Sequence, residues 1–242
     1  MLPLRRHIAA TLFLLATAAA AQQPRTTILL DPAHGGPDAG AHLANNVLEK
    51  DVTLAFAARL RAALGGANFA VLTTRDADPA AAMPPDQRAG IANHARPAAC
   101  LVLHATGSGN GIHLIASALA ANAPQRTIPW DTAQSTAIPQ SLALAIQLDA
   151  AFVRARIPAL LLRARLRPLD NLTCPAIAIE LAPLDNPGGS PTPVTDAAYQ
   201  QQAADAIAKA LTAWRVQIAP QPAPQSTPQP APPDTPPTGA AP

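Results

Sequence analysis

Four polar residues stand at points of this sequence where chemistry is expected in an α/β protein: His34, Glu49, His104 and Glu180. Three of them follow or end short apolar runs typical of buried strands, at residues 27–30, 99–103 and 175–179. The fourth, Glu49, lies at the start of a stretch with helical periodicity. In an open α/β sheet, ligands and reacting groups gather just beyond the carboxyl ends of the strands. We therefore expect these side chains to meet at one edge of a sheet.

The residue types point to hydrolysis assisted by a metal ion. Two imidazoles and one carboxylate form a common hydrolytic zinc set, which leaves a fourth coordination position open. Zinc held in this way lowers the pKa of water to about 7 and polarises a carbonyl, while a nearby carboxylate carries protons. The sequence has no short two-histidine helix motif. The ligands would therefore come from separate strands and loops.

Each residue also has an ordinary structural explanation when it is taken alone. His34 could be a loop residue, His104 a hydrogen-bonded core histidine, and Glu49 part of a helix capping box that starts at Asn46. Glu180 is different, because an ionised carboxylate at the end of an apolar strand costs several kcal/mol unless something compensates it. No lysine or arginine lies near it in sequence. Its partner is therefore either a bound cation or a residue brought close by the fold.

The pattern of apolar residues predicts the elements that position these side chains. Apolar runs alternate with amphipathic stretches, which is typical of an α/β domain with a largely parallel sheet. Val52, Phe56, Leu60 and Leu64, for example, recur every four residues and line one helix face. The predicted strands are residues 27–30, 69–73, 100–103, 111–117, 159–162 and 176–179. The predicted helices are residues 47–64, 86–95, 139–156 and 196–214.

Both ends of the chain differ from this middle part. Residues 1–21 combine Arg5 and Arg6, an apolar stretch and a small-residue cleavage site, which predicts a secretory signal peptide rather than a membrane anchor. Residues 219–242 contain ten of the 28 prolines and are predicted to be a proline-rich tail without a folded core. One folded domain is left, at residues 25–218. We expect an exported protein, periplasmic or extracellular, with no stable membrane span after cleavage.

Composition and the remaining polar residues narrow the choice of partner only slightly. A formal net charge of +2 is too small to suggest a nucleic acid. Cys100 and Cys174 precede two predicted strands, so they form either a disulfide or two buried thiols, and both readings stay open. We expect His113 to be an exposed strand-edge histidine. Surface positions are expected for His42 and His94, and a solvated charged edge for Arg163, Arg165 and Arg167.

Several segments of the chain, in order, resemble the zinc-dependent N-acetylmuramoyl-L-alanine amidases of the type 3 cell-wall amidase family. They are LDPAHGGPDAG (30–40), LEKD (48–51), LTTRD (72–76), RAGIAN (88–93), LVLHA (101–105) and PAIAIEL (175–181). The resemblance implies that His34, Glu49 and His104 bind one zinc ion per chain and that Glu180 is the catalytic carboxylate. It also implies a six-stranded, mostly parallel sheet flanked by helices. The implied substrate is peptidoglycan, cut at the amide between the lactyl group of N-acetylmuramic acid and the L-alanine of the stem peptide.

The resemblance has two departures beside the predicted site. Ala33 replaces the glycine usual in the family, and Ala182-Pro183-Leu184-Asp185 replaces its usual Gly-Phe-Leu-Ser. Two alternatives therefore stay open: a zinc amidohydrolase acting on soluble muropeptides or another small amide, and a non-catalytic wall-binding relative. The sequence leaves a regulatory protein partner open and does not identify one.

Overall fold

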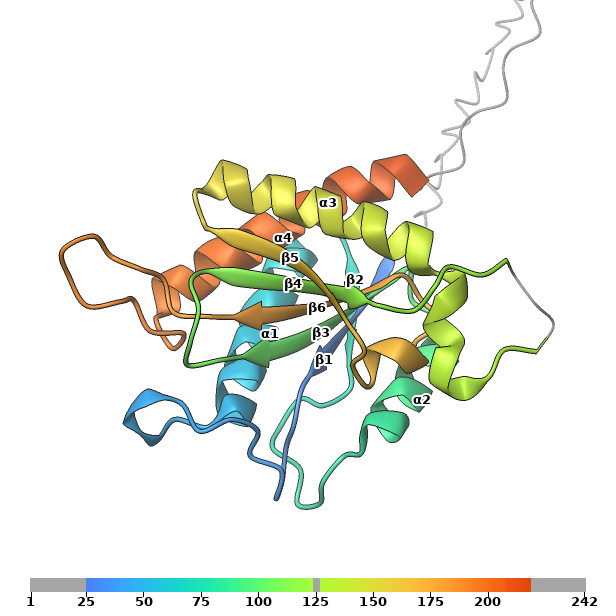
Figure 1. Ribbon diagram of the computed structural model, residues 1–242, viewed down its shortest axis with the longest axis horizontal. Coiled ribbons are helices and arrows are strands. Elements are labelled where there is room, and N and C mark those ends of the chain that lie inside the picture. The colour runs from blue at the N-terminus through green and yellow to red at the C-terminus, as the bar shows by residue number, and fades with distance from the viewer. Residues whose placement is uncertain (1–24, 124–126, 219–242) are drawn as a thin grey trace, which may run out of the picture.

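The computed structural model describes residues 25–123 and 127–218. The predicted signal peptide at residues 1–21 and the predicted tail at residues 219–242 lie outside the described residues. The described residues form a single α/β domain with a six-stranded, mostly parallel sheet (Figure 1). This confirms the fold class predicted from the sequence.

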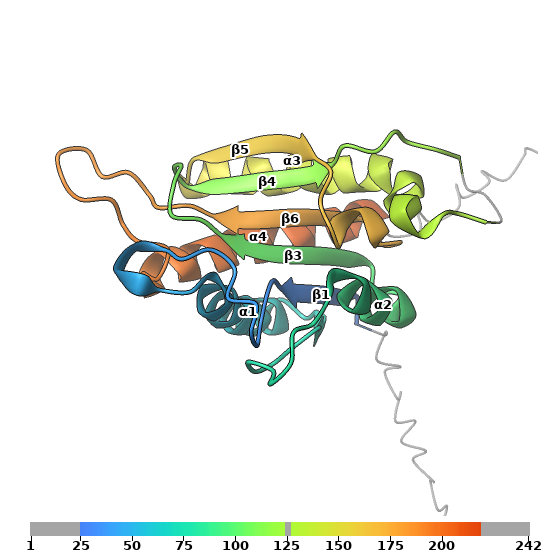
Figure 2. The same ribbon diagram turned by 60° about the horizontal axis from the view of Figure 1, so that its bottom comes forward.

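The sheet has the strand order β2-β1-β3-β6-β4-β5. Its strands are β1 Thr27–Pro32, β2 Ala70–Thr73, β3 Ala99–Ala105, β4 Ile112–Ser117, β5 Ala159–Ala164 and β6 Ala176–Leu181. Neighbouring strands are parallel except β4 and β6, which are antiparallel. The arrowheads of β4 and β5 therefore point opposite to those of β1, β3 and β6 (Figure 2). As a result, the start of β4 lies at the same edge of the sheet as the end of β6.

Helices cover both faces of the sheet, as the apolar character of the central strands requires. The α-helices in the described ranges are α1 Glu49–Gly66, α2 Pro85–Ala95, α3 Ile138–Ala155 and α4 Ala197–Ile218. Short 3-10 helices are η1 Ala44–Asn46, η2 Trp130–Thr136 and η3 Leu169–Asn171. Helices α1, α3 and α4 lie on one face, and α2 lies on the other (Figure 2). All the helices and strands predicted from periodicity are present, with ends that differ by a few residues.

The side chains of β3 point alternately to the two faces of the sheet, so this one strand contributes to two hydrophobic clusters. Leu101 and Leu103 pack with α1, α3 and α4, whereas Cys100 and Val102 pack on the face of α2. All four side chains are fully buried, so β3 is fixed from both sides. A strand fixed in this way holds the residue that follows the apolar run, His104, in a defined direction.

Helix α3 is the most apolar of the helices that cover the sheet. In the described ranges, no single helix is long and apolar enough to cross a membrane; η2 and α3 together, bent by 66°, reach that length and composition. The apolar side chains of α3, including Leu144, Leu148 and Phe152, are buried in the core of the domain.

Candidate metal centre

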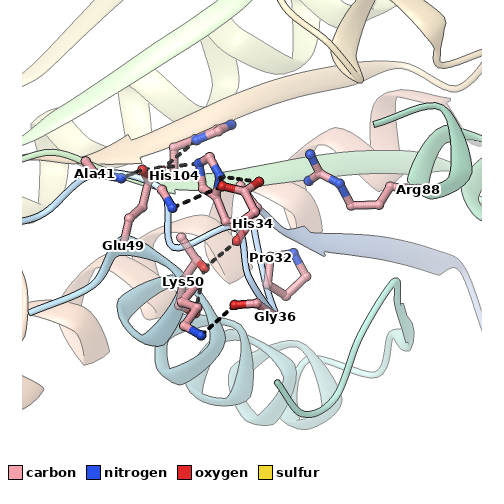
Figure 3. Close-up of polar contacts among 12 residues, drawn as sticks. Pro32, His34, Gly36, Ala41, Glu49, Lys50, Arg88 and His104 are labelled. Atoms are coloured by element: carbon pink, nitrogen blue, oxygen red, sulfur yellow. Dashed lines mark hydrogen bonds and ion pairs between the residues drawn. The ribbon is translucent and has the colours of Figure 1, made fainter. Parts of the chain in front are cut away.

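Three of the four predicted site residues lie together at the edge of the sheet. His34, Glu49 and His104 each offer one ligand atom, and these atoms lie within 4.8 Å of one another (Figure 3). They come from three separate elements: the loop after β1, the first residue of α1, and β3. The sequence prediction that such a set would assemble from separate strands and loops agrees with this geometry.

His34 is held by the shape of the loop that follows β1. The backbone of His34 is left-handed, with φ 65°, which turns the chain back toward α1. Its Nε2 lies 3.2 Å from Glu49 Oε2, and its Nδ1 lies 2.9 Å from the carboxylate of Asp38. A carboxylate on the second ring nitrogen fixes the tautomer and the orientation of a ligand histidine.

Gly40 allows this loop to approach the site closely. Its φ is +68°, and an added Cβ would lie 2.6 Å from Cδ2 of His34 and 2.7 Å from Oε2 of Glu49. A side chain at this position would displace both candidate ligands, so only glycine fits.

Glu49 is buried and is kept ionised by the groups around it. Its Oε1 lies 2.8 Å from Nδ1 of His104 and accepts the amide N–H of Ala105, while its Oε2 accepts the amide N–H of Ala41. Burial by itself raises the pKa of Glu49, but the hydrogen bonds from His104, His34 and Ala41 outweigh it and hold that pKa well below its ordinary value. Glu49 is therefore anionic near neutral pH.

The residues of this group fit a metal ion. His104 has one ring nitrogen against Glu49, and the other, Nε2, is buried without a hydrogen-bond partner among the described residues. Leaving a buried polar atom unpaired is costly, and such an atom calls for an explanation. Two imidazoles and one carboxylate are also the ligand types of hydrolytic metal sites. A cation bound among these residues would neutralise Glu49.

Arg75 ties together the two elements that carry His34 and Glu49. Its Nε donates to the carbonyl of Pro32, and one terminal nitrogen donates to the carbonyls of Ala33 and Lys50, at 3.0, 3.1 and 2.7 Å respectively. The first two carbonyls precede His34 and the third follows Glu49. Arg75 is buried, so these bonds act in a region of low dielectric. Its segment was recognised in the sequence, but its role in holding the loop was not.

Lys50 also holds the loop that carries His34, through contacts near the surface. Its Nζ donates to the carbonyl of Gly36 and to Asp78, both at 2.8 Å. Asp78 in turn accepts the amide N–H of Gly36 at 2.7 Å. The loop that carries His34 is therefore attached to the start of α1 (Figure 3) and, through Asp78, to the segment after β2.

Glu180 lies beside the candidate metal ligands His34, Glu49 and His104, which we call the metal group, but it is not one of the three. On β6 it is the register partner of His104 on β3 and of His113 on β4. Nδ1 of His113 lies 2.6 Å from Oε2 of Glu180. The compensating group that the sequence required for Glu180 is therefore supplied by the fold.

The prediction that His113 is an exposed strand-edge histidine is wrong. Strand β4 is paired on both sides, with β6 and β5, and only 16% of the His113 side chain is exposed. The physical reason is the antiparallel direction of β4, which brings the beginning of that strand to the edge where Glu180 ends β6. His42 and His94 are exposed, as predicted.

The two cysteines, and the arginines at the end of β5 and just after it, serve the structure around this centre. Cys100 and Cys174 form a disulfide with a Cα–Cα distance of 6.1 Å, which decides between the two readings of the sequence. Arg163, Arg165 and Arg167 are exposed, which confirms the charged edge. Arg163 donates to backbone carbonyls of Ser117 and Leu119, and Arg165 pairs with Asp170.

A small cleft is lined in part by Val47, Thr106 and Pro183, which lie two or three positions along the chain from Glu49, His104 and Glu180 respectively. Its volume is about 100 Å³. Its walls come from the segment before α1, the loop after β3 and the chain after β6, and its apolar lining includes Leu43, Val47, Pro183 and Val194. Pro183 belongs to the segment in which this sequence departs from the resembled family. The cleft therefore differs in lining from what that family pattern would give.

Similarity to known proteins extends over most of the chain. The family profile described as N-acetylmuramoyl-L-alanine amidase matches residues 28–213. A germination-specific N-acetylmuramoyl-L-alanine amidase of Bacillus subtilis (strain 168) is 51% identical over 51 residues, which are 21% of each protein. The matched part thus covers about a fifth of that relative.

Solved structures share the whole fold. The N-acetylmuramoyl-L-alanine amidase AmiC2 of Nostoc punctiforme has a TM-score of 0.58 at 24% identity, over 78% of this chain and 97% of that one. The N-acetylmuramyl-L-alanine amidase Ami1 from Mycobacterium smegmatis has a TM-score of 0.63 at 22% identity, over 79% and 97%. The described domain thus corresponds to nearly the full length of both solved chains.

Proposed function

We propose, since the chain belongs to the N-acetylmuramoyl-L-alanine amidase family, that it is a zinc-dependent enzyme that cuts peptidoglycan. The bond hydrolysed is the amide between the lactyl group of N-acetylmuramic acid and the L-alanine of the stem peptide. The observation that carries the proposal is the convergence of His34, Glu49 and His104 from three elements, with Glu180 next to His104 in register.

One zinc ion would be held by the two imidazoles and the carboxylate of this group. Bound there, zinc would polarise the scissile carbonyl and make water more acidic. The ionised state of Glu49 and the ring nitrogens of His34 and His104 that lie against it support this assignment. Asp38 orients His34, and Arg75 holds the loop, so the ligands are arranged before an ion arrives.

Glu180 is proposed to move the protons of the reaction. Its carboxylate takes a proton from the attacking water as the water oxygen bonds to the lactyl carbonyl carbon. It then returns that proton to the alanine nitrogen as the carbon–nitrogen bond breaks. The products are a free lactyl carboxylate and a stem peptide that begins with L-alanine.

The cleft lined by Leu43, Val47, Pro183 and Val194 suits an apolar part of the substrate. Its lining includes no charged side chain, so we assign an apolar part of the substrate to it. We place the enzyme outside the cytoplasm, in the periplasm or the cell wall, because peptidoglycan lies there. Residues 1–21 would then act as the export signal.

The test replaces Glu180 by glutamine, which keeps the size of the side chain but cannot accept the proton. We expect Glu180→Gln to slow the release of stem peptides from purified sacculi by about 10²- to 10⁴-fold, with zinc content by elemental analysis unchanged. Asp185→Asn, at an exposed carboxylate in the segment after β6, is the matched control and should keep full activity. Normal turnover by Glu180→Gln would remove Glu180 from the mechanism.

Substrate choice is tested on the wild-type protein with insoluble sacculi and with soluble muropeptides. Cleavage of both at the lactyl–alanine amide, identified by mass spectrometry of the products, is expected. Cleavage of the soluble substrate alone would favour an amidohydrolase of small wall fragments. Binding to sacculi with no cleavage and no bound zinc would favour a wall-binding protein.

A further inference from the structure

We infer that His113 is a positioning residue that holds the carboxylate of Glu180 for proton transfer. The inference rests on the proposed role of Glu180 and adds to it a residue of β4 that lies outside the metal group.

The first observation is a row of three residues across the sheet. His104 on β3, Glu180 on β6 and His113 on β4 are successive register partners. Residues directly opposite each other on neighbouring strands share a face, and their Cβ atoms lie about 5 Å apart in antiparallel pairs. Glu180 therefore stands between a candidate metal ligand on one side and a second imidazole on the other.

The second observation is the short contact between the two side chains. Nδ1 of His113 lies 2.6 Å from Oε2 of Glu180, and the side chains are 16% and 27% exposed. A ring N–H at Nδ1 can donate to this oxygen and stabilise the ionised carboxylate. With Oε2 occupied by His113, Oε1 is left to accept a proton. The bond also removes the freedom of the carboxylate to rotate, and such orientation is what general base catalysis requires.

The third observation is that the ring of His113 is itself confined. Gly109, in the loop between β3 and β4, has φ +94°, and an added Cβ would lie 2.7 Å from both Cε1 and Nε2 of His113. The backbone of Gly109 therefore lies close to the Cε1–Nε2 edge of the ring and leaves no room for a side chain there. Confinement between a loop backbone and a carboxylate is expected of a ring whose direction matters.

A buried tyrosine ties together the two backbone segments that carry the pair. The hydroxyl of Tyr199 lies 2.8 Å from the carbonyl of Gly111 and 2.9 Å from that of Ala182. The amide N–H of Ala182 also donates to the carbonyl of Gly111. These positions are two residues before His113 and two after Glu180. The distance between the paired side chains is therefore set by α4 as well as by the sheet.

The test compares three substitutions of His113 on a soluble muropeptide with an intact lactyl–alanine amide, so that kcat and KM are measured separately. His113→Ala removes the donor, His113→Asn returns an N–H at the position of Nδ1, and His113→Leu keeps bulk without a donor. We expect kcat to fall about 10- to 100-fold in the alanine and leucine variants, with KM and zinc content unchanged. The asparagine variant should recover most of the loss. If the alanine variant does not fold, the leucine and asparagine variants give the same comparison.

A double variant separates this inference from the function on which it rests. Because His113 acts through Glu180, adding His113→Leu to Glu180→Gln should cause no further loss of kcat. Activity in Glu180→Gln alone would overturn the proposed function, whatever His113 does. Full kcat in His113→Leu, a loss that asparagine does not restore, or additive losses in the double variant would overturn the role of His113 and leave the role of Glu180 standing.

Discussion

Both carboxylate oxygens of Asp38 lie 2.9 Å from Nδ1 of His34, on the side of the ring opposite the nitrogen that faces Glu49. Asp38 is four residues from His34, and the turn between them is closed by paired backbone hydrogen bonds between Gly35 and Asp38. The loop thus carries both a candidate ligand and the group that aims it.

The first prediction concerns Asp38. The negative charge of Asp38 orients His34 and makes its ring more basic. Asp38→Asn removes this charge, and we therefore expect zinc affinity to fall about 10- to 100-fold. Competition with a chromophoric chelator measures this directly. Asp51→Asn, an exposed carboxylate on α1, should leave affinity unchanged. An unaltered affinity in Asp38→Asn would show that the turn alone aims His34.

The second prediction concerns pH. The hydrogen bond to Glu49 raises the pKa of His34 above its ordinary 6.5, and Asp38 adds to this, although burial opposes both. Protonated His34 cannot bind a metal ion, so zinc binding must release its proton. Zinc affinity should therefore decline as pH falls through this raised pKa, beginning above the range of an ordinary histidine.

This pH dependence is measured as the apparent zinc affinity from about pH 5 to 8. In Asp38→Asn the decline should move to lower pH, because one of the groups that raises the pKa of His34 is weakened. The folding stability of the metal-free protein depends on pH in the opposite direction. A raised pKa of His34 stabilises the folded state below pH 6.5, and this contribution is lost as pH rises through the raised value. A decline in affinity that begins only below 6.5 would contradict the assignment.

The sequence was sufficient to predict the parts of the site that follow parallel strands. His34 and His104 come after apolar runs, and parallel strands bring their carboxyl ends to one edge. Glu180 was also identified, because a carboxylate at the end of an apolar strand needs a partner. The identity of that partner could not be predicted. His113 is at the beginning of its strand, and the direction of β4 depends on how the connection after β3 packs, which local sequence does not encode.

The contacts of Arg75 are a second feature that the sequence alone could not predict. Its segment is recognisable, but its hydrogen bonds go to backbone carbonyls of Pro32, Ala33 and Lys50. Carbonyl acceptors are present at every residue, so the sequence carries no signal for which of them an arginine meets. Only the fold, by placing β2 next to β1, decides it.

The third prediction concerns this arginine. Lysine at position 75 would keep the charge but not the planar set of donors that reaches several carbonyls at once. We expect Arg75→Lys to lower the free energy of unfolding by about 2 kcal/mol and to weaken zinc binding, because the loop with His34 loosens. Urea denaturation of the metal-free protein and a chelator titration measure the two effects. The control is Arg61→Lys, at an exposed pair with Asp76, where little change is expected.

The last prediction concerns the disulfide between Cys100 and Cys174, which closes a loop of 74 residues between the start of β3 and the segment before β6. Both cysteines are buried, in the core that lies on the face of α2. A cross-link over this separation restricts the unfolded chain, so Cys100→Ala/Cys174→Ala should lower the free energy of unfolding by about 2 to 4 kcal/mol. Zinc affinity should change little, because β3 remains paired on both sides and still presents His104.

Urea denaturation of the native and reduced wild-type protein provides the comparison, and the reduced protein should match the double variant. Two free thiols in a titration of the unfolded, unreduced protein would contradict the bridge. Disulfides form and persist mainly in oxidising compartments, so recovery of this bridge from cells also tests the proposed export.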